Sequence, residues 1–210
     1  MSSKIIRNCV RREDFYSAFV GEIERNYDWV KTETIDDTYE VGCRYYFTEN
    51  EYISIVYMDR NYTSLCIRIG NESDKEACWQ NINASYIAYT IVITGGSIAI
   101  AIDSSMNDGN LITNDFRIMI TDVNGTKVGI YNDYQWFNGG CKSNTEGNNQ
   151  IRRIQSAYEW TQLIPFGLPE LAGVSPDVFV IRYSPFAQSK IEIDGTKYML
   201  GDYYAIRLED

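Results

Sequence analysis

One apolar stretch, residues 84–103, constrains the fold more than any other part of the chain. It reads ASYIAYTIVITGGSIAIAID and holds no charge before Asp103. Two apolar runs flank Gly95-Gly96, and glycine takes the positive φ of a two-residue turn without a Cβ clash. Apolar residues fill successive positions of both runs, which predicts burial on both faces. We therefore expect a central β-hairpin.

The same region is long enough to raise the question of a transmembrane helix, because residues 77–102 carry no charge. Three amides, Gln80, Asn81 and Asn83, and the glycine pair interrupt the run, and the residues around them favour strands. We expect no membrane insertion.

Before this region, residues 11–27 form the best helical pattern, with Phe15, Phe19 and Ile23 at four-residue steps among charged positions. An amphipathic helix that docks on a sheet explains the pattern, and packing on a neighbouring subunit is the alternative. From residue 29 onward, short strand-like runs alternate with polar turns. The sequence predicts a mainly β protein, an antiparallel β-sandwich or barrel-like domain with a short N-terminal α-helix. We assign residues 1–28 to an arm and this helix, and 29–210 to a single antiparallel β domain.

Three turns divide the remaining strand-like runs. Asn124-Gly125 and Asp194-Gly195 each lie between two β runs and predict hairpins, and residues 59–61 predict a third hairpin loop. Residues 72–83 and 138–150 are expected to be loops, the second exposed and mobile. Residues 152–161 fit a strand or a single helical turn.

The charge balance and the cysteines limit partners and compartment. A formal net charge of -10 opposes binding to a phosphate backbone, so we expect no nucleic-acid partner. The five cysteines form no CxxC motif, and the opening MSSKIIRNCVRRED lacks an apolar signal segment. We expect reduced thiols in a cytoplasmic compartment, where the four Asn-x-Ser/Thr sites would go unused.

Histidine is absent, which excludes Ser-His-Asp and Cys-His catalysis and histidine metal sites within one chain. Phosphate-binding glycine motifs are also missing, so we expect no cofactor. The 29 acidic residues form no distinctive pair. Calcium is conceivable at residues 103–110 or 122–125, but hairpin turns select the same residue types, and we expect no metal.

Aromatic clusters are the strongest candidates for contacts, because Tyr and Trp combine apolar area with a polar tip. The first candidate group, within residues 131–137, borders a polar loop. The second, within residues 166–168, lies in an apolar Pro/Gly segment, and the third is the apolar stripe of the expected helix. The interaction residues we expect are Tyr131, Tyr134, Trp136, Phe137, Phe166, Leu168, Phe15, Phe19 and Ile23.

The order of these features resembles small virion structural proteins of tailed bacteriophages and phage-like particles. The resemblance rests on the helix leading into a Trp in DFYSAFVGEIERNYDWV, on RYYFTENEYISIVYM and SLCIRIG, on YIAYTIVI with GSIAIAID, and on the closing IEIDGTKYMLGDYYAIRLE. It implies a non-enzymatic subunit of a tail, neck, baseplate or capsid, and it supplies no catalytic residues. Its partners would be itself, as a homo-oligomer, and other virion proteins.

The resemblance further implies assembly in the bacterial host cytoplasm and a final location in the virion. A different class of function fits the aromatic content as well. The alternative is a carbohydrate-binding module or a histidine-free glycosidase with an aromatic sugar-binding surface.

Overall fold

The computed structural model is described for part of the chain. The described residues are 2–57, 65–71, 75–82, 85–103, 116, 118–123, 125–131, 141–142, 153–154, 160–162, 164–165, 177–180, 190–193, 195–201 and 204–209.

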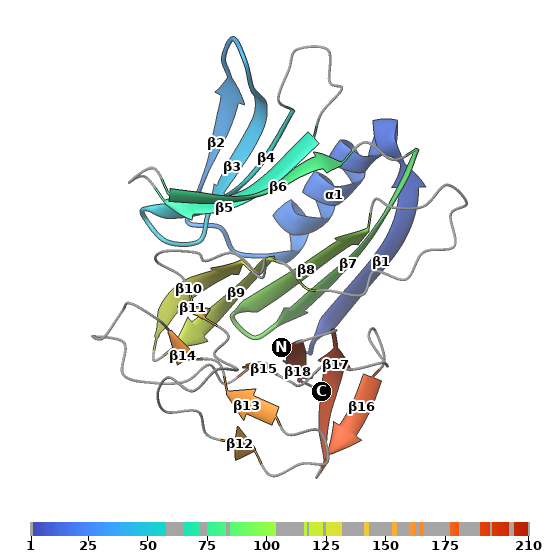
Figure 1. Ribbon diagram of the computed structural model, residues 1–210, viewed down its shortest axis with the longest axis vertical. Coiled ribbons are helices and arrows are strands. Elements are labelled where there is room, and N and C mark those ends of the chain that lie inside the picture. Colours follow the sequence, from blue (N-terminus) through green and yellow to red (C-terminus); the bar gives the residue numbers. More distant parts are fainter. Residues whose placement is uncertain are drawn as a thin grey trace. The chain divides into compact units, whose positions relative to one another are not determined.

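Strands dominate the described residues, and one helix follows the first of them (Figure 1). The elements are β1 (Lys4–Arg11), α1 (Arg12–Asn26), β2 (Lys31–Asp36), β3 (Val41–Tyr46), β4 (Glu51–Tyr57), β5 (Leu65–Asn71), β6 (Lys75–Ile82), β7 (Tyr86–Thr94), β8 (Ser97–Asp103), β9 (Ile118–Val123), β10 (Thr126–Tyr131), β11 (Cys141–Lys142), β12 (Arg153–Ile154), β13 (Trp160–Gln162), β14 (Ile164–Pro165), β15 (Val178–Val180), β16 (Lys190–Ile193), β17 (Thr196–Leu200) and β18 (Tyr204–Leu208).

The strands form three larger sheets and a two-stranded pair, β11-β14. The N-terminal sheet has the order β2-β3-β4-β5-β6, the middle sheet β1-β7-β8-β9-β10, and the C-terminal sheet β12-β13-β15-β18-β17-β16. Neighbouring strands of the N-terminal sheet pair antiparallel throughout. The mainly β class with a short N-terminal helix is confirmed.

The chain groups into two compact units, residues 7–89 with 103–111, and residues 1–6 with 90–102 and 112–210. The boundary falls inside β7, between Tyr89 and Thr90, and inside β1, between Ile6 and Arg7. From the sequence we expect a boundary at residue 28, between the helical arm and the β domain. The grouping differs from that division, because α1 belongs to the same unit as the N-terminal sheet.

The central hairpin is confirmed as β7 and β8. Gly95 adopts φ 49° in its turn, a value that suits glycine. Side chains alternate between the two faces of a strand, yet consecutive residues from Ile87 to Val92 are all at most 3% exposed. Both faces of the hairpin are therefore covered. In the described part of the chain, no helix is long and apolar enough to span a membrane.

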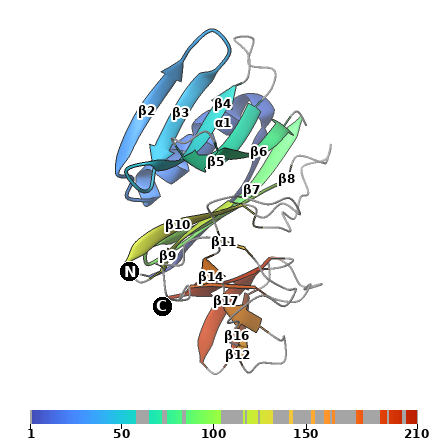
Figure 2. The same ribbon diagram turned by 60° about the vertical axis from the view of Figure 1, so that its left-hand side comes forward.

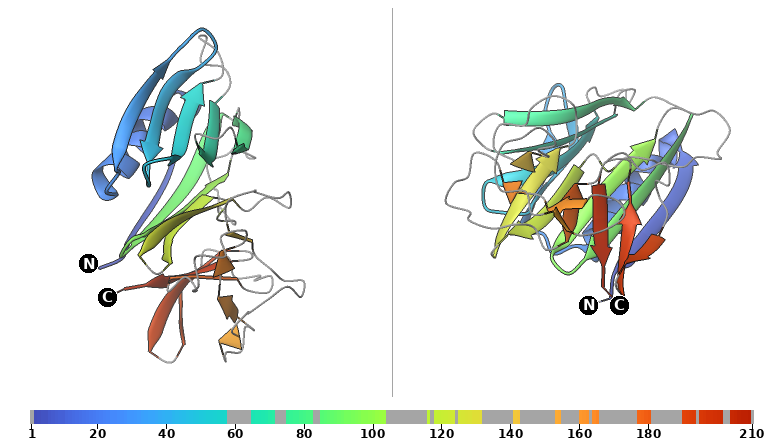
Figure 3. Two further views of the ribbon diagram at one scale, coloured as in Figure 1. Left: turned by 90° about the vertical axis from the view of Figure 1, so that its left-hand side faces the viewer. Right: turned by 60° about the horizontal axis from the view of Figure 1, so that its bottom comes forward.

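The unit that contains residues 90–102 is a β-sandwich. One apolar core joins residues from the middle sheet to residues from the C-terminal sheet: Val92, Ala99, Ala101, Met119, Val178, Met199, Ile206 and Leu208, together with Phe116. The chain ends meet in this unit, where the Ser3 N–H donates to the Glu209 carbonyl at 3.0 Å (Figure 3). Interdigitated side chains from two sheets are the basis of sandwich stability.

In the other unit, α1 covers a sheet face as its apolar stripe predicts. Phe15, Phe19 and Ile23 are completely buried. The rings of Phe15 and Phe19 stack at 5.1 Å, and both meet Tyr89 of β7 edge-on, at 5.7 and 5.3 Å. Docking of the helix on a sheet is confirmed.

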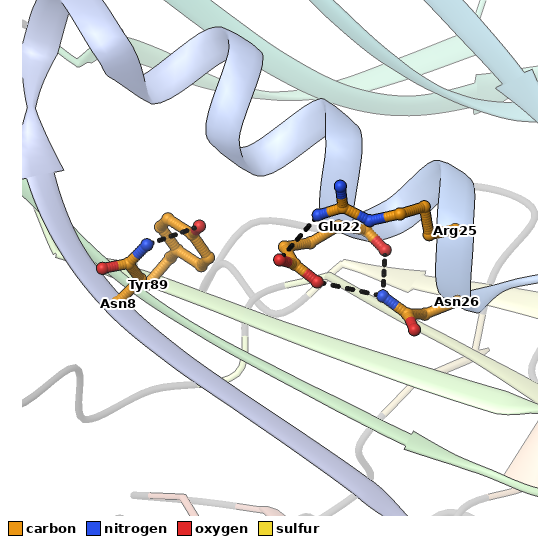
Figure 4. A network of polar contacts seen from close by, with 5 residues as sticks. All are labelled: Asn8, Glu22, Arg25, Asn26 and Tyr89. Atoms are coloured by element: carbon orange, nitrogen blue, oxygen red, sulfur yellow. Dashed lines mark hydrogen bonds and ion pairs between the residues drawn. The ribbon is translucent and has the colours of Figure 1, made fainter.

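Polar contacts secure the C-terminal end of this unit's helix (Figure 4). The side-chain amide of Asn26 donates to the Glu22 backbone carbonyl at 2.6 Å, and the Trp29 indole donates to the Ile23 backbone carbonyl at 3.0 Å. The Trp29 bond satisfies a carbonyl that has lost its intrahelical partner at the C-terminus. Near the start of the helix, Asn8 donates to the Tyr89 hydroxyl at 3.3 Å, which links β1 to β7.

Several local expectations are corrected. Residues 75–82 form strand β6 and not a loop, and Cys141–Lys142 forms β11 within the segment expected to be mobile. Of the two alternatives for residues 152–161, the strand is the one found, as β12 and the start of β13. Cys66 is disulfide-bonded, so the expectation of reduced thiols is wrong for it, while Cys9 and Cys43 are free.

The hairpin expectations are confirmed where the strands are described. Gly125 and Gly195 adopt φ 81° and 77° between paired strands. Strand β4 pairs antiparallel with β5, as expected, but the connecting residues 58–64 lie outside the described residues.

Close backbone packing makes Gly42 of β3 a sensitive position. A Cβ there would lie 2.1 Å from the Ile55 carbonyl oxygen and 2.8 Å from Val56 Cα. We expect Gly42→Ala to lower the free energy of unfolding by about 1–3 kcal/mol. Urea unfolding measures the change. Gly21→Ala is the matched control, because the nearest atoms to its Cβ belong to the Arg25 side chain, at an ordinary contact distance of 3.7 Å, and the helix gains up to about 1 kcal/mol. Equal stability of the two variants would contradict the account.

A charged side chain introduced into the central hairpin should prevent folding. Ile91 and Ile100 are completely buried, so Asp at either position leaves an unpaired charge in the core. We expect Ile91→Asp and Ile100→Asp to cost more than about 4 kcal/mol and to abolish the cooperative thermal transition. Val30→Asp, at a position 57% exposed, should unfold like the parent. A folded Ile91→Asp protein would refute burial on both faces.

Candidate interaction surface at the β2 edge

Strand β2 lies at one edge of the N-terminal sheet (Figure 2). Within the described residues, β3 is the strand that pairs with it, from Lys31 opposite Tyr46 to Asp36 opposite Val41. Five of its six residues are exposed, and Ile35 is buried. The strand has neither proline nor glycine, so its edge is regular and can accept another strand.

The hydrogen-bond pattern between β2 and β3 shows which backbone groups of β2 point away from the sheet. The Asp37 N–H donates to the Glu40 carbonyl at 3.0 Å, which makes this pair a bonded pair of the antiparallel ladder. Bonded pairs alternate along the strand, so Ile35 and Glu33 bond toward β3. The backbone N–H and C=O groups of Thr32 and Thr34 consequently point away from the sheet.

Two exposed apolar side chains flank this strand. Val30, just before β2, is 57% exposed, and Tyr39, in the β2–β3 turn, is 75% exposed. They are the large apolar residues classed as exposed among those described. Asp37 fixes the turn, because its carboxylate accepts from the Tyr39 and Glu40 N–H groups, both at 2.7 Å. The Tyr39 ring is thus held outward by a structured turn.

Charged side chains of β2 lie against their own sheet. The Lys31 amine lies 3.9 Å from the centre of the Tyr46 ring, and the Tyr46 hydroxyl donates to Glu33 at 2.8 Å. That hydrogen bond is the main reason why the pKa of Glu33 is lowered. Arg44 lies 3.5 Å from the same carboxylate. These contacts draw Lys31 and Glu33 toward β3.

A further ion pair anchors the turn to the body of the sheet. Arg68 of β5 donates through both terminal nitrogens to the Glu40 carboxylate. Their side chains are only 11% and 18% exposed, so the pair is shielded from solvent. A bidentate contact fixes orientation as well as distance. The β2–β3 hairpin is therefore rigidly connected to the central strands of the N-terminal sheet.

The sequence pointed to other residues for contacts. Phe15, Phe19 and Ile23 are completely buried in this chain, so they stabilise its own fold and are no part of an exposed surface. Tyr131 closes β10, but its side chain is outside the described part of the structure, and Tyr134, Trp136, Phe137, Phe166 and Leu168 lie outside the described residues altogether.

Sequence reasoning missed Val30, Thr32, Thr34 and Tyr39. The signal was present in KTETID, where polar residues occupy consecutive positions and so face both sides of a strand. That pattern is typical of an edge.

The sugar-binding alternative loses part of its support. An aromatic sugar-binding surface needs exposed rings, but the neighbouring Tyr45 and Tyr46 are at most 2% exposed and cannot stack on a ligand. Burial raises the pKa of Tyr45, whose hydroxyl donates to Glu24 at 2.8 Å. These two rings are core residues of the sheet.

A separate buried polar cluster lies in the sandwich unit. Ser97 of β8 donates to Asp177 at 2.9 Å, and its oxygen lies 2.9 Å from the Thr121 hydroxyl of β9. Asp177 is 7% exposed, and its carbonyl accepts from the Arg207 N–H at 2.7 Å. Burial raises the pKa of Asp177, although the Ser97 bond lowers it. The cluster ties the middle sheet to the C-terminal sheet.

Metal binding has no candidate in the residues described, where no group of three acidic or cysteine side chains is close enough to hold an ion. The Asp122 carboxylate, one of the conceivable calcium ligands, accepts the Gly125 N–H at 2.7 Å and so fixes the hairpin turn. Residues 104–110 of the other conceivable loop lie outside the described residues.

Comparison of the chain with protein-family models, with curated proteins and with solved structures found no match.

Asp177 should make stability depend on pH. Its raised pKa means that the folded state favours the protonated carboxyl, so this stabilisation is complete below the ordinary value of 3.8 and is lost as pH rises through the raised value. We expect Asp177→Asn to lose less stability than the parent between pH 4 and pH 7. Urea unfolding across this range measures it.

Asp28→Asn is the control for that experiment, because it removes one carboxyl from an exposed position in the other unit and leaves the surroundings of Asp177 unchanged. It should follow the pH dependence of the parent. If Asp177→Asn follows the parent as well, the carboxyl of Asp177 does not govern the pH dependence.

Proposed function

We propose that this protein is a non-enzymatic structural or assembly subunit of a phage-type virion, acting through protein–protein contacts. The observation that supports it is the β2 edge, where an accessible strand is bordered by Val30 and Tyr39. Addition of a strand to a sheet edge is a common way for proteins to associate, and exposed aromatic residues are typical anchors of interfaces.

The construction of the edge agrees with a structural role. The Glu40–Arg68 pair and the Asp37-bonded turn hold the β2–β3 hairpin in one conformation before any partner arrives. A preformed surface loses little conformational entropy on binding, which suits repeated assembly. The disulfide at Cys66 fits a protein that persists in an oxidising medium, such as a released particle.

The layout resemblance to virion proteins gives this proposal its particular class. Partners would be further copies of the chain and other virion proteins, and assembly would take place in the bacterial host cytoplasm. The net charge of -10 supports protein partners over nucleic acid.

Co-sedimentation with particles tests the proposal. We expect the full chain, expressed in cells that produce phage-like particles, to sediment with those particles in a density gradient and to be detected there by mass spectrometry. Val30→Asp combined with Tyr39→Asp should reduce incorporation at least about tenfold, because two apolar contacts become charged. Both positions are exposed, so the double variant should still fold.

Lys190→Gln combined with Lys197→Gln is the control, since it changes the net charge by the same amount at two exposed positions away from β2. Its incorporation should equal that of the parent. A parent chain that never sediments with particles would refute a virion function.

A further inference from the structure

We infer that β2 is the site of a two-fold contact, in which β2 of a second copy of this chain adds antiparallel to form one continuous sheet. The inference deepens the proposed function, because it names the partner of that same surface. It rests on the outward backbone groups of Thr32 and Thr34, on the flanking apolar residues and on the distribution of charge along the strand.

The hydrogen-bond pattern of β2 limits the registers in which two copies of the strand can pair. In an antiparallel pair, residues that bond across the new edge must both direct their backbone groups outward. The outward residues are every second residue of β2, including Thr32 and Thr34. A symmetric contact can therefore be centred on any residue of β2, because each such choice pairs outward residues only with outward residues. Glu33 and Thr34 lie at the middle of the strand and give the longest overlap, and Thr32 is a neighbouring choice with a shorter overlap.

Charge and hydrogen bonding favour Thr34 as the centre. A contact centred on Glu33 would place Glu33 directly opposite its own copy, and like charges in that position repel. A contact centred on Thr32 would pair Thr34 with Val30, whose N–H already donates to the Tyr46 carbonyl at 2.8 Å. With Thr34 at the centre, Glu33 lies opposite Ile35, and Lys31 lies opposite Asp37 with complementary charge.

The same register brings the exposed apolar residues together. Antiparallel pairing places the start of one β2 beside the end of the other, so Val30 lies opposite Thr38 and next to Tyr39 of the second copy. Two-fold symmetry makes this contact twice, once at each end of the strand pair. Both residues classed as large, apolar and exposed are then covered by a single arrangement.

The charges on β2 do not prevent this pairing. Lysine and glutamate on an edge strand often block association. Here Lys31 lies over the Tyr46 ring and Glu33 accepts from the Tyr46 hydroxyl, so both are drawn toward their own sheet.

Oligomeric state in solution tests the inference on the full chain. Light scattering after size-exclusion chromatography should give twice the chain mass of 24.2 kDa. Thr34→Pro removes an outward N–H, a change that edge strands tolerate, and should weaken the dimer at least about tenfold. Thr34→Val retains the N–H and should remain dimeric. A monomeric parent, or a Thr34→Pro variant that stays folded and as dimeric as the parent, would overturn the inference.

Cysteine cross-linking tests the register without relying on proline. The test needs a Cys43→Ser background, because Cys43 is a free thiol directly opposite residue 34 in β3 and would otherwise capture a new cysteine within the same chain. In that background Thr34→Cys should form a covalent dimer on mild oxidation, because the two copies of residue 34 are opposed. Thr32→Cys should not, since its two copies lie four residues apart along the pair, about 13 Å. The Cys43→Ser chain, in which Cys9 stays free, sets the background. Cross-linking of Thr32→Cys in preference to Thr34→Cys would refute the register.

The two proposals fail separately. A dimer through β2 that never enters particles would refute the virion function and leave the strand contact intact. Entry of a Thr34→Pro chain into particles at the parental level would support the function and overturn β2 as the contact between copies.

Discussion

The structure depends on the need to cover both faces of β7 and β8. These strands have almost no polar side chains to offer to water, so every neighbouring element must supply apolar surface. Tyr89 receives the edges of Phe15 and Phe19 in one unit, whereas Val92 belongs to the sandwich core of the other. The few polar groups in this hairpin need partners in the interior, and Ser97 finds them in Thr121 and Asp177. Thr94 departs from this rule, because its hydroxyl has no hydrogen-bond partner among the described residues.

Local chemistry explains which parts of the fold were predictable. Gly95, Gly125 and Gly195 each adopt positive φ between paired strands, and the residue types alone required those turns. The helix was predictable because its three buried residues recur at helical spacing. Strand β1 was not, because KIIRNCVR becomes a strand by pairing with β7, far along the chain. Strand β6 was missed because its charged and amide residues read as a loop.

The candidate surface shows a different limit. The helical stripe of Phe15, Phe19 and Ile23 was expected to make contacts, yet all three residues are buried in the chain's own core. Val30 and Tyr39 stand apart from that stripe, and their exposure follows from the position of β2 at an edge. The position of a strand at the edge of a sheet is set by pairing between residues far apart in the sequence, so local patterns indicate it only weakly. The Cys66 disulfide is likewise a consequence of tertiary proximity that spacing along the chain did not indicate.

Symmetry limits what the proposed β2 contact could build. An isologous contact uses the same surface on both copies, so it closes after two chains and cannot by itself extend into a ring or a tube. A subunit repeated around a particle axis therefore needs a second, heterologous surface. The aromatic segment around Tyr134 and Trp136, which sequence reasoning selected independently of the fold, has the residue types that such a surface favours. On this argument β2 would make the elementary pair, and the second surface would set how pairs are arranged in the assembly.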